Sequence, residues 1–88
     1  MGKFTVKEDG NNGSVEVDAD EIVRTHKRRL GRDDKVRIPM RTVSSVDHDS
    51  QLGGDVVTVK TPGAVYAWKL SDDEAKQLTA EIRAYIAR

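Results

Sequence analysis

The stretch LSDDEAKQLTAEIRAYIAR, residues 70–88, predicts an amphipathic helix that begins at Ser71. Ser71 and Glu74 are spaced as a capping box, in which the hydroxyl accepts from the backbone amide three residues on and the glutamate reaches back. Apolar residues then recur at helical spacing and form one stripe: Ala75, Leu78, Ile82, Tyr85 and Ile86. No other segment carries such a stripe, so this helix must pack on β-structure.

Alternation of apolar and polar residues predicts a hairpin in the first third of the chain. Residues 14–19 put valine and alanine on one side and acidic residues on the other, the pattern of a half-buried antiparallel strand. A turn at residues 18–20 leads into a second strand over residues 22–29. Residues 3–7 also alternate, but a run of turn residues follows them. We therefore expect an N-terminal extension or short edge strand over residues 1–12 and the ordered domain over residues 13–88.

The middle of the chain predicts one more strand, then a turn with a strand restart, and then a loop. Residues 35–40 alternate, and Pro39 cannot donate to a ladder, so this strand should lie at a sheet edge or bend there. Val43 and Val46 are spaced for a turn followed by a new strand. Residues 47–54 are polar and end in two glycines, which indicates a loop.

The clearest hairpin joins residues 55–61 to residues 64–70 through Pro62-Gly63, a pair suited to a tight turn. We expect Tyr66, Trp68 and Leu70 to face the helix, with Trp68 as the anchor of the core. The opposite face of this strand, together with two valines of the preceding strand, should lie outside the core: Val65, Ala67, Val57 and Val59.

These segments together predict an α+β protein: an antiparallel β roll or half-barrel of five to six strands, capped by one C-terminal amphipathic helix. Its 88 residues are enough for one domain with a small core. The chain has no cysteine, no membrane-spanning apolar run and no signal-like start, so we expect a cytoplasmic protein. Frequent Arg, Asp, Val and Ala suggest a GC-rich bacterial or phage genome.

The order of these elements resembles the small PH-like (pleckstrin-homology-like) domains of bacteria over residues 12–88. The residues that carry the resemblance are Asn12-Gly13 opening a strand with Val15 and Val17, then Ile22, Ile38-Pro39-Met40, Val43, Val46 and the helix end Ile82-Arg83-Ala84-Tyr85-Ile86. The resemblance implies a non-enzymatic binding module without a cofactor, because PH-like domains are binding scaffolds.

The net charge is zero, yet the charges are sorted along the chain. Residues 1–23 carry two lysines and six acids, whereas residues 24–41 carry eight basic residues and two aspartates. If the strands at residues 22–29 and 35–40 pair, the cations of this middle segment lie within reach of one another. We take them as candidate anion- or partner-binding residues: Arg24, Lys27, Arg28, Arg29, Arg32, Lys35, Arg37 and Arg41.

Several interpretations of this basic hairpin stay open. It could hold an anionic headgroup, a role at which the resemblance to PH domains points. It could associate with nucleic acid, although the sequence offers no exposed aromatics interleaved for base stacking. It could also be a solvated face balanced by acidic residues. A further possibility lies elsewhere, in an open sheet edge that recruits a strand from a partner protein or a second copy.

The sequence predicts neither a catalytic group nor a metal site. Asp47-His48-Asp49 joins two carboxylates and an imidazole, but adjacent strand residues cannot all point the same way, and structural zinc would need more histidine or cysteine. Ser44 and Ser45 lie near His48 without a third group to orient a base. Gly53-Gly54 lacks the helix and lysine of a phosphate-binding loop.

Overall fold

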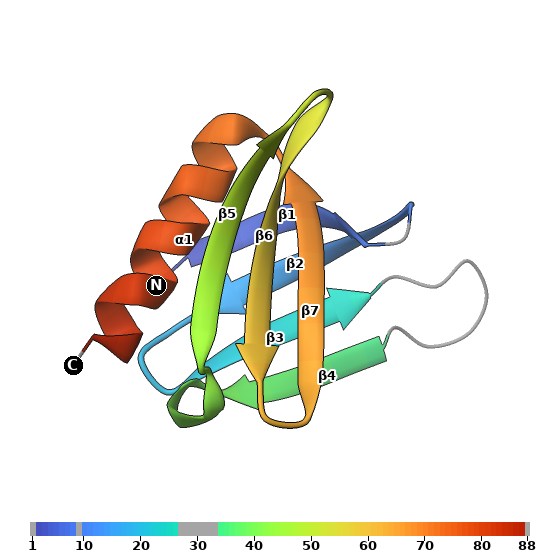
Figure 1. Ribbon diagram of the computed structural model, residues 1–88. Coiled ribbons are helices and arrows are strands. Elements are labelled where there is room, and N and C mark those ends of the chain that lie inside the picture. Colours follow the sequence, from blue (N-terminus) through green and yellow to red (C-terminus); the bar gives the residue numbers. More distant parts are fainter. Residues whose placement is uncertain (1, 9, 27–33, 88) are drawn as a thin grey trace.

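A computed structural model describes residues 2–8, 10–26 and 34–87, which form one antiparallel sheet and one α-helix (Figure 1). In chain order the elements are β1 (Gly2–Glu8), β2 (Asn11–Val17), β3 (Glu21–His26), β4 (Asp34–Pro39), the 3₁₀ turn η1 (Met40–Thr42), β5 (Ser45–Gln51), β6 (Gly54–Thr61), β7 (Ala64–Leu70) and α1 (Asp72–Ile86). The seven strands lie in the order β4-β3-β2-β1-β7-β6-β5. The prediction of an α+β fold with one C-terminal helix is confirmed, but the strand count exceeds the expected five to six.

One additional strand is β1, which lies inside the sheet between β2 and β7. It pairs with β2 along its whole length, and the apolar side chains that alternate in it, Phe4 and Val6, are buried in the core. Residues 2–8 therefore form an interior strand of the domain instead of an extension or an edge strand. Burial of these two side chains outweighs the local turn signals that follow them.

The other strand beyond the expected count is β5: the new strand predicted after the turn at Val43 does begin, at Ser45, but the prediction of a loop over residues 47–54 is wrong. β5 pairs with β6 from Ser45↔Lys60 to Gln51↔Gly54, and the turn is confined to Leu52 and Gly53, where Gly53 has a φ of 84°. The segment is polar because its outward side chains face water. It is a strand because its backbone hydrogen-bonds to the apolar strand β6, which its own sequence does not indicate.

The sheet folds over onto itself around the core. The strands β1–β4 run across the direction of β5–β7, and the two sets meet at one register pair, Lys7↔Lys69 (Figure 1). α1 packs on β5 and β6 along one side of this arrangement. Trp68 is fully buried as the expected anchor, with Tyr66 stacked on it at a centroid distance of 5.9 Å.

The faces of the last hairpin are predicted correctly for β7 but not for β6. Val65 is 65% exposed, as expected. Val57 and Val59 are fully buried, so their expected position outside the core is wrong. The register explains the difference, because Val57 pairs with Trp68 and Val59 with Tyr66, and directly paired residues share a face.

Two local predictions from sequence signals are confirmed. Pro39 ends β4, which is an edge strand, and η1 then turns the chain into β5. Ser71 is the N-cap of α1, with its hydroxyl accepting from the Glu74 backbone amide at 3.4 Å and donating to the Glu74 carboxylate at 3.1 Å. Of the described residues, no helical segment has the length and apolar character needed to cross a membrane.

Candidate functional site

Among the described residues, the cations expected to form one basic patch do not all share a face. Arg24 has the parity of buried Ile22 and points to the inner side of the sheet, whereas Lys35 and Arg37 are exposed on the outer side of β4. Arg37 forms an ion pair with Glu21 at 2.6 Å, and Arg41 lies exposed in η1. The other candidates, Lys27, Arg28, Arg29 and Arg32, lie outside the described residues.

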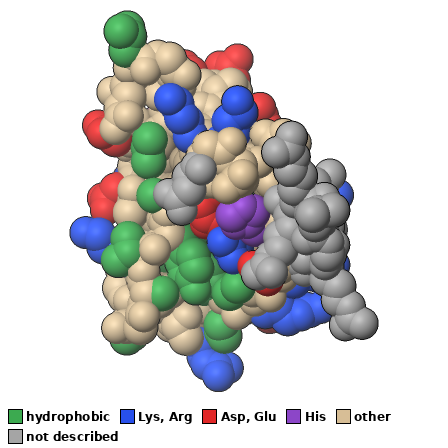
Figure 2. Space-filling model, turned by 90° about the vertical axis from the view of Figure 1, so that its right-hand side faces the viewer, with side chains coloured by type: hydrophobic (Ala, Val, Ile, Leu, Met, Phe, Trp, Pro, Cys, Tyr) green, Lys and Arg blue, Asp and Glu red, His purple; other side chains and the backbone are tan. Residues whose placement is uncertain are grey.

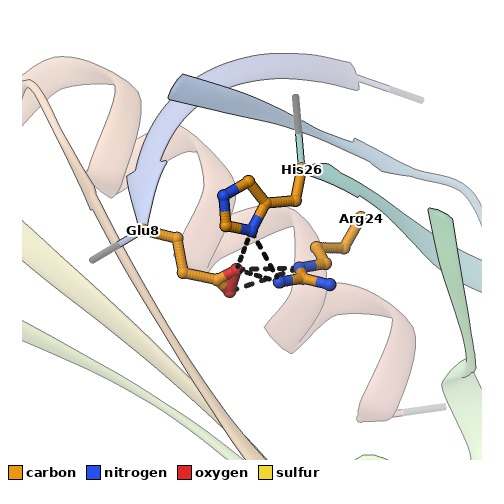
Figure 3. A network of polar contacts seen from close by, with 3 residues as sticks. All are labelled: Glu8, Arg24 and His26. Carbon is orange, nitrogen blue, oxygen red and sulfur yellow. Dashed lines mark hydrogen bonds and ion pairs between the residues drawn. The ribbon is translucent and has the colours of Figure 1, made fainter. Parts of the chain in front are cut away.

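Arg24 belongs instead to an inward-facing polar cluster with Glu8 and His26 (Figure 3). The Arg24 Nε donates to Glu8 Oε1 at 2.8 Å and Oε2 at 3.2 Å, and its Nη2 also bonds to Oε1. His26 Nδ1 lies 3.2 Å from Arg24 Nη2, and because a guanidinium can only donate, Nδ1 is the acceptor. The cluster links β1 to β3 across the intervening β2.

Burial decides what this cluster does. The side chains of Arg24, Glu8 and His26 are only 16%, 15% and 21% exposed. On the right-hand side of the molecule in Figure 1, acidic and basic atoms gather around a histidine beside hydrophobic side chains (Figure 2). In this largely buried bidentate pair the Arg24 and Glu8 charges compensate each other, so neither needs a ligand as counter-ion. We therefore assign the pair a structural role instead of ligand binding.

A second polar cluster lies at the N-terminal end of α1. His48 of β5 has the parity of buried Val46 and points inward, where its Nε2 lies 2.6 Å from Asp55 Oδ2 of β6. Ser50 donates weakly to the same oxygen at 3.5 Å. Asp72, the first residue of α1, completes a group of three whose ligand-type atoms all lie within 4.8 Å of one another.

The electrostatics of this cluster centre on Asp55, whose side chain is 7% exposed. The hydrogen bond with His48, and next that with Asp72, holds the pKa of the Asp55 carboxyl below its usual range, although burial opposes this shift. Asp72 is 57% exposed and also pairs with Lys76 at 3.2 Å. Within the described residues, this is the one group of three histidine or acidic side chains close enough to share a metal ion.

Sequence reasoning missed this cluster for a specific reason. It tested His48 against its neighbours Asp47 and Asp49, which do point the other way, and the partners come from residues 55 and 72. The available signal was period-two parity: if residues 45–51 are a strand, His48 shares a face with Val46 and therefore with the core.

The edges of the sheet are the remaining candidate. β5 is one edge, and its exposed outer side chains are acidic or polar: Asp47, Asp49 and Gln51. The Val46 carbonyl accepts from Arg83 Nη2 of α1 at 3.4 Å, so its backbone points away from β6. Because hydrogen-bonding direction alternates along an antiparallel strand, the backbone groups of His48 and Ser50 point away from β6 as well.

No protein-family model and no curated protein matches this chain. The geometry of the clusters and edges is therefore the basis for a functional assignment.

Proposed function

We propose that this chain is a non-enzymatic, PH-like binding module that takes an extended, basic segment of a partner protein as an added strand on β5. The observation that carries the proposal is the position of β5 as an edge strand that holds no proline or lysine and whose backbone groups at His48 and Ser50 point away from β6. The order of antiparallel strands followed by one closing helix supports the PH-like interpretation.

The choice of β5 over the opposite edge rests on side chains that discourage pairing. β4 carries Lys35, Arg37 and Pro39, and lysine and proline are the residues with which proteins protect sheet edges. β5 offers outward backbone donors and acceptors at His48 and Ser50, whereas the outward Val46 carbonyl already accepts from Arg83 of α1. An incoming strand would thus find main-chain partners at His48 and Ser50.

The charge on β5 indicates the chemistry of the partner. Asp47 and Asp49 are exposed on its outer face, so lysine or arginine at alternate positions of the incoming strand would lie opposite them. Opposite charges across a strand pair contribute roughly 0.2–1 kcal/mol each. A second copy of β5 paired antiparallel about His48 would set Asp47 against Asp49, and this repulsion favours a foreign basic segment over self-association.

The experiment is peptide selection on the protein in a buffer that contains a chelator. A display library of linear peptides of about ten residues, enough to pair with a whole strand, is panned on the wild type. Enriched peptides should carry basic residues at alternate positions and shift the backbone amide NMR signals of β5. Ser50→Pro removes the outward N–H and should weaken binding at least about tenfold, whereas Ser50→Ala keeps it and should not.

A charge variant separates strand addition from general adhesion. The double variant Asp47→Lys, Asp49→Lys leaves the backbone edge intact but reverses its charge. It should therefore bind the basic peptides more weakly than the wild type, while the variant and the wild type unfold at the same temperature. Peptides that bind the Ser50→Pro protein as well as the wild type, or that shift residues away from β5, would contradict the proposal. The proposal would also be contradicted if the selection enriched no peptide.

A further inference from the structure

We propose that His48, Asp55 and Asp72 form a binding site for one divalent transition-metal ion of the zinc class. The three side chains come from β5, β6 and the first turn of α1, and only the tertiary fold brings them together. The inference is separate from strand addition, since it concerns the inner face of β5 and not its free edge.

The geometry is close to what such an ion requires. Zinc binds imidazole nitrogen and carboxylate oxygen at about 2.0–2.2 Å, so two ligand atoms on one ion lie at most about 4.4 Å apart. All ligand atoms of the cluster lie within 4.8 Å of one another, so the most distant pair would have to approach by at most about 0.4 Å. The closest pair, His48 Nε2 and Asp55 Oδ2, is at 2.6 Å and must open slightly when the ion replaces the shared proton.

Two ligands of the site are largely buried and the third is exposed, so an ion could enter from the solvent side. The His48 and Asp55 side chains are 17% and 7% exposed, and the protein core fixes their positions. Asp72 is 57% exposed and closes the site from the solvent side. Its ion pair with Lys76 is an exposed contact between residues four apart on a helix, which contributes little and can give way to a divalent ion.

The donor set selects the class of metal. One imidazole with two carboxylates suits zinc, cobalt and manganese, whereas calcium and magnesium prefer all-oxygen sites. Asp55 is buried and Asp72 lies beside it, so a bound cation would compensate the negative charge of both carboxylates. Three protein ligands leave room for a further ligand on the ion.

A bound ion would join the β5–β6 hairpin to the start of α1. In the unfolded chain nothing holds the three ligands of residues 48, 55 and 72 together, so the metal binds the folded state preferentially. At a free metal concentration a hundredfold above the dissociation constant, the equilibrium constant for unfolding should fall about a hundredfold.

The test uses the full chain, freed of metal by a chelator, and titrations with Zn²⁺ and Co²⁺. We expect saturable binding, a visible absorption band of cobalt, and Zn²⁺-induced shifts of the His48 ring signals with the His26 signals unchanged. Asp72→Asn and His48→Gln should weaken binding about tenfold or more, since even outer partners of metal ligands matter at this level. Asp73→Asn, one residue along the same exposed helical turn, should leave binding unchanged.

Several results would overturn the proposal. Equal Zn²⁺ affinity of the Asp72→Asn and Asp73→Asn proteins would mean that the ion binds surface carboxylates without this site. The same conclusion would follow if Mg²⁺ or Ca²⁺ competed equally with Zn²⁺, or if saturable binding were absent. The thermal unfolding midpoint should rise with Zn²⁺ in the wild type and the Asp73→Asn protein alone, and a chelator should reverse the rise.

Discussion

Replacing Arg24 by methionine should destabilise the protein by about 3 kcal/mol, because it leaves the Glu8 carboxylate buried without its cation. Breaking a fully buried ion pair costs roughly 3–5 kcal/mol. We take the lower limit, since the Arg24 and Glu8 side chains are still 16% and 15% exposed. For a domain of this size, such a loss corresponds to a fall of roughly 12–24 °C in the unfolding temperature.

A double-mutant cycle isolates the pair. Glu8→Gln alone leaves Arg24 with an uncompensated charge and should also destabilise, whereas the double variant removes both charges and should cost less than the sum of the two single changes. The assay is urea unfolding followed by circular dichroism for all four proteins. A coupling free energy above about 1 kcal/mol is the expected result for groups in direct contact.

The exposed ion pair between Lys3 and Glu16 supplies the control, because its side chains are 70% and 58% exposed. Glu16→Gln should change the free energy of unfolding by less than about 1 kcal/mol. If Arg24→Met costs no more than Glu16→Gln, or if the Glu8 and Arg24 changes are additive, the assignment of a structural role to this cluster is refuted.

Three further results are expected. Trp68→Ala should cost roughly 3–5 kcal/mol in urea unfolding, as for other fully buried large aromatics, and a near-neutral value would contradict its place in the core. Ser71→Ala should lower the free energy of unfolding by about 1 kcal/mol, because it removes the helix cap, and the helical signal should begin to fall at a lower temperature on heating. Identical melting curves of the variant and the wild type would show that the cap contributes nothing. The backbone amides of Glu21 and Asp20 lower the pKa of the Asp18 carboxyl. The charged carboxylate therefore stabilises the fold at pH values above its ordinary pKa of 3.8, and this stabilisation is lost as the pH falls through the lowered pKa. The difference in stability between the wild type and Asp18→Asn should therefore shrink in acid, and a difference independent of pH would contradict this.

The sequence determined the elements whose signals are local. A capping box and a helical stripe located α1, proline and glycine located the β6–β7 turn, and parity oriented Trp68. In each case the deciding interactions lie within a few residues along the chain, so the pattern alone is sufficient.

The tertiary structure decided what depends on partners distant in sequence. β5 is a strand because β6 pairs with it, and Val57 is buried because it lies opposite Trp68. Arg24 is inward and neutralised because Glu8, two strands away, bonds to it. The candidate metal ligands His48, Asp55 and Asp72 converge only when the hairpin packs on the start of α1. Each residue type was visible in the sequence, but strand register and packing set the distances between them, and no local pattern encodes those distances.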